Sequence, residues 1–250
     1  MDHSVVVPVY NEQESIRALY DRLKHVMEKM ASDYEIVFVD DGSGDASFNV
    51  LKKIASGDGK VKILSFSRNF GQHPAVIAGF EAASGEMILT LDADLQNPPE
   101  EIPRLIEAMR GGHDMVSGIR SARQDTAFRR SGSFFTVMFL NILSGSNVRD
   151  YGTMLRAFRK DFAKTLAERY RKERLYIPVL VNKLTKNILE VEAGHETRFS
   201  GSSKYGMLKL IKTFISIFIR WHHKLSLFLQ SVHMMKKDGI LYEIEEKINL

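Results

Sequence analysis

The sequence contains no cysteine, a single tryptophan and only six prolines among its 250 residues. The absence of cysteine excludes disulfides, cysteine-bound zinc and cysteine nucleophiles, and it favours a reducing compartment. No uncharged, apolar run approaches the roughly 18 residues that a membrane-spanning helix requires. Because a strand-like run begins almost at the first residue, we expect no secretory signal peptide. The length suits one large domain, or one domain with an appendage.

Charge is divided unevenly along the chain. Residues 1–100 carry 9 Lys and Arg against 16 Asp and Glu, whereas residues 101–250 carry 26 against 15. The acidic part suits a metal site, and the basic part suits phosphate groups or an anionic membrane surface. No nucleic-acid-binding motif accompanies the basic residues, so we expect no nucleic-acid partner.

Strand-like runs alternate with helical patterns through the first 118 residues. The expected strands are 4–9, 35–40, 61–67, 87–92 and 114–118, and the expected helices are 13–30, 46–55, 75–83 and 99–110. This alternation predicts an α/β fold with a mainly parallel, doubly wound sheet. In such sheets ligands bind beyond the carboxyl ends of the strands.

The pattern changes after residue 119. Residues 131–143 form a strongly apolar helical stretch, residues 151–158 can return to the sheet, residues 160–174 suit a charged helix and connection, and residues 188–191 suit a short strand. A glycine- and serine-rich loop follows at 197–205. We therefore expect one domain over 1–205, an amphipathic membrane-interface segment at 206–235 and a charged tail at 236–250.

Two carboxylates end the fourth expected strand. Asp92 and Asp94 lie two residues apart where the chain turns, so both can face one hard cation such as Mg²⁺ or Mn²⁺, and Gln96 can add an amide oxygen. The alternative is a pair of surface acids in a turn. The apolar strand before them and the helix-starting Asn97-Pro98-Pro99 after them favour the metal site. A cation held there would neutralise a diphosphate, which points to a nucleotide-sugar substrate.

Acidic and aromatic residues also follow the first two strands. Asp40 or Asp41 can accept a hydrogen bond from a nucleobase N–H or a ribose hydroxyl. The alternative is a strand-to-helix turn with an N-cap, which explains Asp45 but not two adjacent acids. The candidates after the first strand are Pro8, which leaves a neighbouring carbonyl free, Tyr10, which can stack on a base, and Glu12.

Seven motifs occur in order: PVYNE, VDDGSGD, SRNFGQH, DADLQNPPEEIPRL, RQDTAFRR, DYGTMLRAFRK and GSSKY. Together they resemble the family 2 glycosyltransferases that load a sugar onto a polyprenyl phosphate, and most of all the bacterial undecaprenyl-phosphate 4-deoxy-4-formamido-L-arabinose transferases. Glucosyl and mannosyl relatives come next. The likeness covers roughly residues 3–210. It implies the nucleotide-sugar-binding GT-A fold, a bridging Mg²⁺ or Mn²⁺, and transfer from a nucleotide-diphosphate sugar, expected to be UDP-linked, to undecaprenyl phosphate.

The resemblance also assigns roles to residues of this chain. Its base-binding positions fall on Pro8, Tyr10, Glu12 and Asp40 or Asp41, and its metal positions fall on Asp92, Asp94 and Gln96. Its residues for the diphosphate and the acceptor phosphate fall on Arg120, Arg129, Arg130 and Ser133, and on Arg198, Ser203 and Lys204 of an acceptor loop. A solvated basic face is the alternative for each arginine. Asp150 falls near the donor sugar, where it orients that sugar or acts as a base, or else it caps the next turn.

A phosphate acceptor simplifies the expected mechanism. A sugar hydroxyl needs a general base, whereas a phosphate monoester with a second pKa of about 6 is already a dianion near neutral pH. The enzyme then has to hold the acceptor in line with the anomeric carbon and stabilise the leaving diphosphate. A single displacement of this kind inverts the anomeric centre.

Residues 206–221 suit a helix that lies in the membrane interface, with Leu208, Ile211, Ile215 and Phe218 on one face. Residues 128–143 can do the same or pack against the sheet. The relatives continue into two or more spanning helices, and this chain departs from them. We therefore expect either peripheral association with the cytoplasmic face of the inner membrane, or a cytoplasmic protein with a separate membrane-anchoring partner.

Two other functions stay open at this point. One is a soluble family 2 transferase with a hydroxyl acceptor, and the other is an inactive nucleotide-sugar-binding remnant. A processive polysaccharide synthase is disfavoured, because Ile217 occupies the glutamine position of the Gln-x-x-Arg-Trp motif that such enzymes carry.

Overall fold

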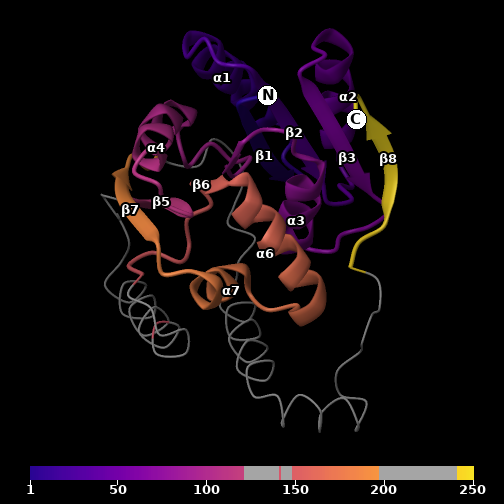
Figure 1. Cartoon of the computed structure of the whole chain (residues 1–250). Helices are drawn as coiled ribbons and strands as arrows, with labels where there is room; N and C mark the ends of the chain where they lie inside the picture. The colour runs from indigo at the N-terminus through magenta and orange to yellow at the C-terminus, as the bar shows by residue number, and fades with distance from the viewer. Residues whose placement is uncertain (121–140, 142–147, 197–240) are drawn as a thin grey trace, which may run out of the picture.

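The computed structural model describes residues 1–120, 141, 148–196 and 241–250 (Figure 1). Within them a central sheet has the strand order β7-β5-β6-β4-β1-β2-β3-β8. The strands are β1 His3–Val9, β2 Tyr34–Asp40, β3 Val61–Phe66, β4 Met87–Thr90, β5 Met115–Arg120, β6 Arg156–Arg159, β7 Ile188–Ala193 and β8 Ile244–Ile248. The helices are α1 Ile16–Lys29, α2 Ser47–Gly57, α3 Gln72–Ala82, the short 3₁₀ turn η1 Pro99–Glu101, α4 Ile102–Met109, α6 Lys160–Glu173 and α7 Ile177–Leu184.

The sheet is mainly parallel, which confirms the predicted doubly wound α/β fold. Strand β1 pairs in parallel with β2 and β4, β2 with β3, and β5 with β7. Two strands run the other way: β6 lies between β4 and β5, and β8 borders β3. The chain builds β1 to β3 in one direction and then crosses to β4 on the other side of β1. A crevice for ligands forms at such a change of direction, beyond the carboxyl ends of β1 and β4.

Helices cover both faces of the sheet (Figure 1). Alternate side chains of a strand point to opposite faces, so Val5 and Val7 pack with α1, α2 and α4, whereas Val6 packs with α3, α6 and α7. In α1 the buried Leu19, Leu23 and Val26 recur at helical spacing, and the helix lies within the range 13–30 expected from the sequence. Full burial of one such side chain stabilises the fold by about 1.5–3 kcal/mol.

Two glycines allow close approaches near the crevice. A Cβ on Gly79 would lie 2.2 Å from Cγ1 of Val6, so α3 packs on β1 at a distance that excludes any side chain there. Gly42 has a φ of +67°, and a Cβ on it would lie 2.3 Å from the backbone carbon of Arg68. The turn after β2 therefore requires glycine for both its backbone angle and its space.

Three elements differ from the sequence-based expectation. Helix α3 begins three residues earlier than expected, at Gln72, because Pro74 is tolerated in the first turn. Helix α7 was not predicted. Strand β8 lies within the expected charged tail, and the ring of Tyr242 just before it stacks on Phe66 with 5.0 Å between ring centres. The charged sequence of β8 concealed it, because an edge strand buries little of either face.

Several predicted segments lie outside the described residues. They are the membrane-interface segment 206–235, the acceptor loop from residue 197 onward and most of the apolar stretch 131–143. Of the helices in the described part of the chain, none combines the length and the apolar character needed to cross a bilayer.

Candidate functional site

The candidate site residues meet at one edge of the sheet. Strands β1, β2, β4, β5 and β7 are parallel, so their carboxyl ends share this edge, and the antiparallel β6 begins there. The edge therefore collects the candidates that follow β1, β2 and β4, together with Asp150 ahead of β6. The backbone of Arg120 ends β5 at the same edge.

The loops after β1 and β2 are joined by hydrogen bonds. The N–H of Asn11 donates to Oγ of Ser43 at 3.0 Å, and the N–H of Gly44 donates to Oδ1 of Asn11 at 2.8 Å. These contacts set Tyr10, which is 38% exposed, beside the acidic loop after β2. Pro8 is buried within β1. The two predicted parts of the nucleotide site are thus neighbours in the fold.

Glu12 and Asp45 both contact the start of α2. The N–H of Glu12 donates to Oγ of Ser47 at 2.8 Å, and Asp45 accepts a hydrogen bond from the N–H of Ser47 at 2.9 Å. Asp45 therefore contacts the first turn of α2, but the N-cap residue is Ala46, one position later than the sequence predicted. The base-binding role of Glu12 stays a prediction.

Asp41 fastens the loop between β3 and α3. Its carboxylate accepts hydrogen bonds from the N–H groups of Phe70 at 2.7 Å and Gly71 at 2.9 Å, and from Nδ2 of Asn69 at 2.9 Å. An ionised acceptor makes such bonds about twice as strong as neutral ones. Asp41 is therefore a structural anchor for the SRNFGQH motif.

Asp40 has a different environment. Its Oδ2 accepts a hydrogen bond from Oγ of Ser65 at 3.2 Å, whereas its buried Oδ1 has no hydrogen-bond partner in the described part of the chain. Burial raises the pKa of Asp40 above its ordinary value. Asp40 thus has a buried carboxylate oxygen without a hydrogen-bond partner in the described residues, and its role in nucleotide binding stays a prediction.

Two hydrogen bonds hold the predicted metal loop, one from the start of α3 and one from within the loop. Oδ1 of Asp92 accepts a hydrogen bond from Nε2 of Gln72 at 2.8 Å, and Oδ1 of Asp94 accepts one from the N–H of Gln96 at 3.1 Å. Leu95, between Asp94 and Gln96, has a φ of +62°. This left-handed backbone angle is energetically costly for a residue with a branched side chain. The strained turn places two carboxylates and an amide within the five residues 92–96. These donors fit a divalent cation, since Mg²⁺ commonly binds one or two carboxylates together with phosphate oxygens.

No cluster of three or more acidic or histidine side chains suited to a metal occurs within residues 1–120, 141, 148–196 and 241–250. The metal assignment therefore depends on Asp92, Asp94 and Gln96 together with oxygens of a substrate.

Asp150 lies in the loop before β6 and is 5% exposed. Its Oδ1 accepts a hydrogen bond from the N–H of Gly152 at 2.8 Å, which is the turn-capping alternative considered for it. Glu190 on β7 holds the same loop, because its Oε1 accepts hydrogen bonds from the N–H groups of Arg149 at 2.8 Å and Asp150 at 3.3 Å. A role at the donor sugar stays a prediction.

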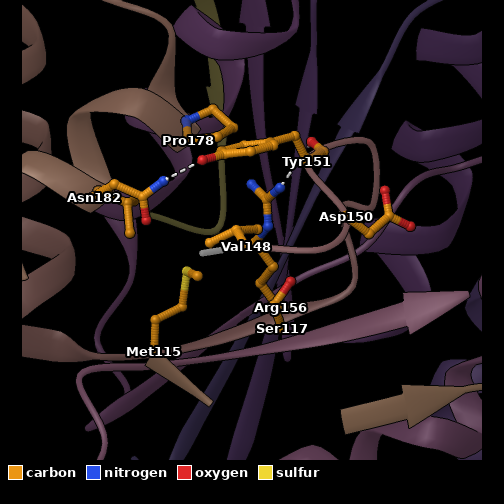
Figure 2. A pocket seen from close by; sticks show the side chains of 9 residues that line it. Met115, Ser117, Val148, Asp150, Tyr151, Arg156, Pro178 and Asn182 are labelled. Carbon is orange, nitrogen blue, oxygen red and sulfur yellow. Dashed lines mark hydrogen bonds between the residues drawn. The ribbon is translucent and has the colours of Figure 1, made fainter. Parts of the chain in front are cut away.

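A buried arginine lies beside Asp150. Arg156, the first residue of β6, is 4% exposed, and Figure 2 shows it rising from the sheet towards Tyr151. Its Nη2 donates to the carbonyl oxygen of Tyr151 at 3.1 Å, while its buried Nε has no hydrogen-bond partner in the described structure. The adjoining cavity, lined also by Ser117 and Asn182, has a free volume of about 10 Å³, close to the space of one water molecule. Burial lowers the pKa of Arg156 although nearby carboxylates favour its charged form.

His73 lies close to Arg156 and packs against Tyr176. Its ring lies edge-on to Tyr176, with 4.9 Å between ring centres. Burial, and to a smaller extent the Arg156 guanidinium, lowers the pKa of His73 to about 4. His73 is therefore neutral in the folded protein at neutral pH.

The low pKa of His73 predicts a loss of stability in acid. The folded-state pKa lies below the unfolded value of about 6.5, so unfolding takes up a proton between pH 6.5 and pH 4, and the free energy of unfolding falls as pH falls through that window. The shift corresponds to about 3 kcal/mol for a fully buried group, and we expect about 2 kcal/mol because His73 is only partly buried. Urea unfolding at pH 7 and pH 4.5 measures this. The variant His73→Gln should lack this component, and an unchanged difference between the two pH values would contradict the assignment.

Sequence reasoning did not identify three side chains of the site. They are Gln72, Asn69 and Arg156. All three lie in motifs that were noted only for their resemblance to a family. Their positions in the sequence do not show which residue each of them contacts across the sheet. The side chain of Arg120 and the residues Arg129, Arg130, Ser133, Arg198, Ser203 and Lys204 lie outside the described part, so their roles stay predictions.

Comparison with known proteins identifies relatives. Residues 4–171 match the family model "Glycosyl transferase family 2". Over 209 residues the chain is 44% identical to undecaprenyl-phosphate 4-deoxy-4-formamido-L-arabinose transferases of Edwardsiella ictaluri and Serratia proteamaculans. Each match covers 83% of this chain and 64% of the relative, so the chain spans less than two thirds of the length of these relatives.

Solved structures share the fold. Glucosyl-3-phosphoglycerate synthase from Mycobacterium tuberculosis, in complex with Mn²⁺, uridine-diphosphate-glucose and phosphoglyceric acid, is 16% identical with a TM-score of 0.63, covering 90% of this chain and 80% of that one. The same enzyme with Mg²⁺ and uridine-diphosphate is 17% identical with a TM-score of 0.61, covering 96% of this chain and 82% of that one. At this identity the likeness confirms the GT-A fold.

Proposed function

Because the chain belongs to glycosyl transferase family 2, we propose that it moves a sugar from a nucleotide-diphosphate donor, UDP-linked, to the phosphate of a polyprenyl phosphate such as undecaprenyl phosphate. The observation that carries this proposal is the common edge of the sheet. There the paired acids Asp92 and Asp94 lie on one strained turn, and Asp92 is tied to the loop that Asp41 anchors beside the predicted nucleotide site. The names of the relatives support the lipid phosphate as acceptor.

The described residues would divide the donor between them. Tyr10 offers an exposed ring for stacking on the base, and Asp40 keeps an acceptor oxygen for a base N–H or a ribose hydroxyl. Asp92, Asp94 and Gln96 would hold Mg²⁺ or Mn²⁺. When bound, that cation supplies Lewis-acid stabilisation of the charge that develops on the leaving diphosphate.

The acceptor needs positioning more than activation. Its phosphate dianion attacks the anomeric carbon, the bond from that carbon to the donor diphosphate breaks, and the nucleoside diphosphate leaves with the bonding electrons. Arg120, Arg129, Arg130, Ser133, Arg198, Ser203 and Lys204 are the proposed phosphate contacts. Asp150 would orient the donor sugar. We place the protein peripherally at the cytoplasmic face of the inner membrane, where its lipid acceptor is accessible.

A panel assay tests the function. Purified protein is incubated with Mg²⁺ or Mn²⁺, a series of nucleotide-sugars and either a short-chain polyprenyl phosphate or the corresponding polyprenol, and products are identified by mass. We expect a glycosylated polyprenyl phosphate and no glycosylated polyprenol. Transfer to the alcohol instead would favour a hydroxyl acceptor, and no transfer with any donor would contradict the proposal.

The acceptor loop predicts a selective defect. Replacing Lys204 or Arg198 with alanine removes a cation from the lipid phosphate, so we expect kcat/KM for polyprenyl phosphate to fall about 10- to 100-fold, in line with the loss of one or two charge-assisted hydrogen bonds. Nucleotide affinity, measured by calorimetry with Mn²⁺, should change less than about twofold. An equal loss in both measurements would show that these residues do not act on the acceptor.

A further inference from the structure

Arg22 on α1 joins three segments of the chain. Its Nε and Nη2 donate to the two carboxylate oxygens of Glu100 at 3.0 and 2.6 Å, and its Nη1 and Nη2 donate to those of Glu196 at 3.1 and 3.0 Å. A guanidinium fork fixes direction as well as distance when it binds a carboxylate through two nitrogens. Arg22 therefore orients both glutamates at once. Its hydrogen bonds lower the pKa of Glu100, which keeps that carboxylate ionised.

The two glutamates belong to different parts of the site. Glu100 lies in η1, which follows the metal loop, whereas Glu196 follows β7 and is the last described residue before the predicted acceptor loop. Figure 1 shows α1, α4 and β7 along one side of the molecule. Arg22 thus connects the metal side of the site to the root of the acceptor side.

Backbone hydrogen bonds reinforce the same connection. The N–H of Glu196 donates to the carbonyl oxygen of Gln96 at 2.9 Å, and the N–H of Gly194 donates to Oε1 of Glu101 at 2.9 Å. Gln96 is itself a predicted metal ligand. Glu196, the last described residue before the predicted acceptor loop, is therefore held directly against the predicted metal loop.

Stability alone is a weak reason for this network. The side chain of Arg22 is 30% exposed and those of Glu100 and Glu196 are about half exposed. Ion pairs at such positions contribute about 0–1 kcal/mol each. A structural role and a positioning role can thus be separated, because a structural role would be visible in the melting temperature and a positioning role in the kinetics of the acceptor.

We propose that Arg22 is a positioning residue that sets the root of the acceptor loop against the metal loop by holding Glu196 beside Gln96. This inference rests on the proposed function, since it assigns the residues after Glu196 to the lipid phosphate. Arg22 touches no reacting atom and acts through Glu196.

The test compares Arg22→Gln with Arg17→Gln. Arg17 lies on the same helix and pairs with Asp21 of that helix at 3.0 Å, so its variant controls for loss of a surface ion pair. For Arg22→Gln we expect the KM for polyprenyl phosphate to rise about tenfold, with nucleotide affinity in Mn²⁺ changed less than twofold and the melting temperature lowered by no more than about 3 °C. Arg22→Lys keeps the charge but not the fork, and should be intermediate. Arg17→Gln should match the wild type.

A double variant adds a second criterion. Glu196→Gln should reproduce the rise in KM, and Arg22→Gln with Glu196→Gln should be no worse than either single change, since both remove the same contact.

An unchanged KM in Arg22→Gln, an equal rise in Arg17→Gln, or parallel losses of acceptor and nucleotide binding would overturn the inference. If the wild-type protein transfers no sugar to polyprenyl phosphate, the proposed function itself fails. An active wild type with an unaffected Arg22 variant removes the positioning role alone.

Discussion

Replacing Asp94 or Asp92 with alanine is expected to reduce sugar transfer at least about 1,000-fold. Electrostatic stabilisation of a leaving group is often the largest single contribution to catalysis, and loss of one preorganised group commonly costs 100- to 1,000-fold. Each aspartate here would contribute both a ligand to the cation and negative charge that retains it. Calorimetry should show, in parallel, that Mn²⁺ no longer strengthens the binding of the nucleoside diphosphate.

The control for this prediction is Asp45→Asn, which changes an acid of the neighbouring loop that contacts the N–H of Ser47 at the start of α2. We expect that variant to retain transfer within about threefold. The variants at Asp92 and Asp94 should remain folded, as judged by circular dichroism and melting temperature. Full activity in either alanine variant would end the metal assignment, and folded variants that lose activity but keep Mn²⁺-dependent nucleotide binding would relocate the cation.

Asp41→Ala is expected to lower the free energy of unfolding by about 2–4 kcal/mol. The change removes the buried carboxylate that accepts hydrogen bonds from Asn69, Phe70 and Gly71, and it leaves their partly buried donors without that charged partner. For a chain of this length the melting temperature falls about 2–4 °C for each kcal/mol, so a decrease of about 10 °C is expected. Because the loop leads into Gln72, which contacts Asp92, activity should decline as well.

Two neighbouring acids serve as comparisons for Asp41. Asp45→Ala removes a 2.9 Å hydrogen bond from Ser47 at a helix start and a longer one of 3.4 Å from Gln13, and should cost about 1 kcal/mol. Asp40→Asn should weaken nucleotide binding with a smaller loss of stability, since one of its oxygens has no hydrogen-bond partner in the described structure. Equal unfolding free energies for Asp41→Ala and Asp45→Ala would show that Asp41 does not anchor the loop.

The parallel core was predictable from sequence because its signals are local. The apolar runs of β1, β2 and β4 each end at polar residues. In a parallel sheet the carboxyl ends of the strands share one edge, so these polar residues are expected to lie together there. Helix α3 was placed late because its first turn, Gln72-His73-Pro74, lacks the apolar periodicity that reveals a helix. Strand β8 has three consecutive charged residues between its two isoleucines, and it pairs with a partner about 180 residues earlier in the chain, which no local pattern encodes.

The sequence offers candidate ligands for the site by residue type, and their roles stay predictions, but it does not reveal the side chains that support them. Acidic residues at the ends of strands indicate metal and nucleotide binding by their residue type alone. The side chains that orient them do so through contacts between distant segments, as Gln72 does for Asp92 and Arg22 does for Glu196. Arg156 is the extreme case, because a charged residue within the short strand Arg156–Arg159 is ordinarily exposed, and here it is buried.

The identity of the released nucleotide tests the central claim most directly. If the phosphate of the acceptor attacks the anomeric carbon, the bond that breaks lies between the sugar and the diphosphate. Mass spectrometry should then find a nucleoside diphosphate and a polyprenyl monophosphate sugar in equal amounts. Release of a nucleoside monophosphate, with a polyprenyl diphosphate sugar as the other product, would mean that a sugar phosphate had been transferred and would contradict the account.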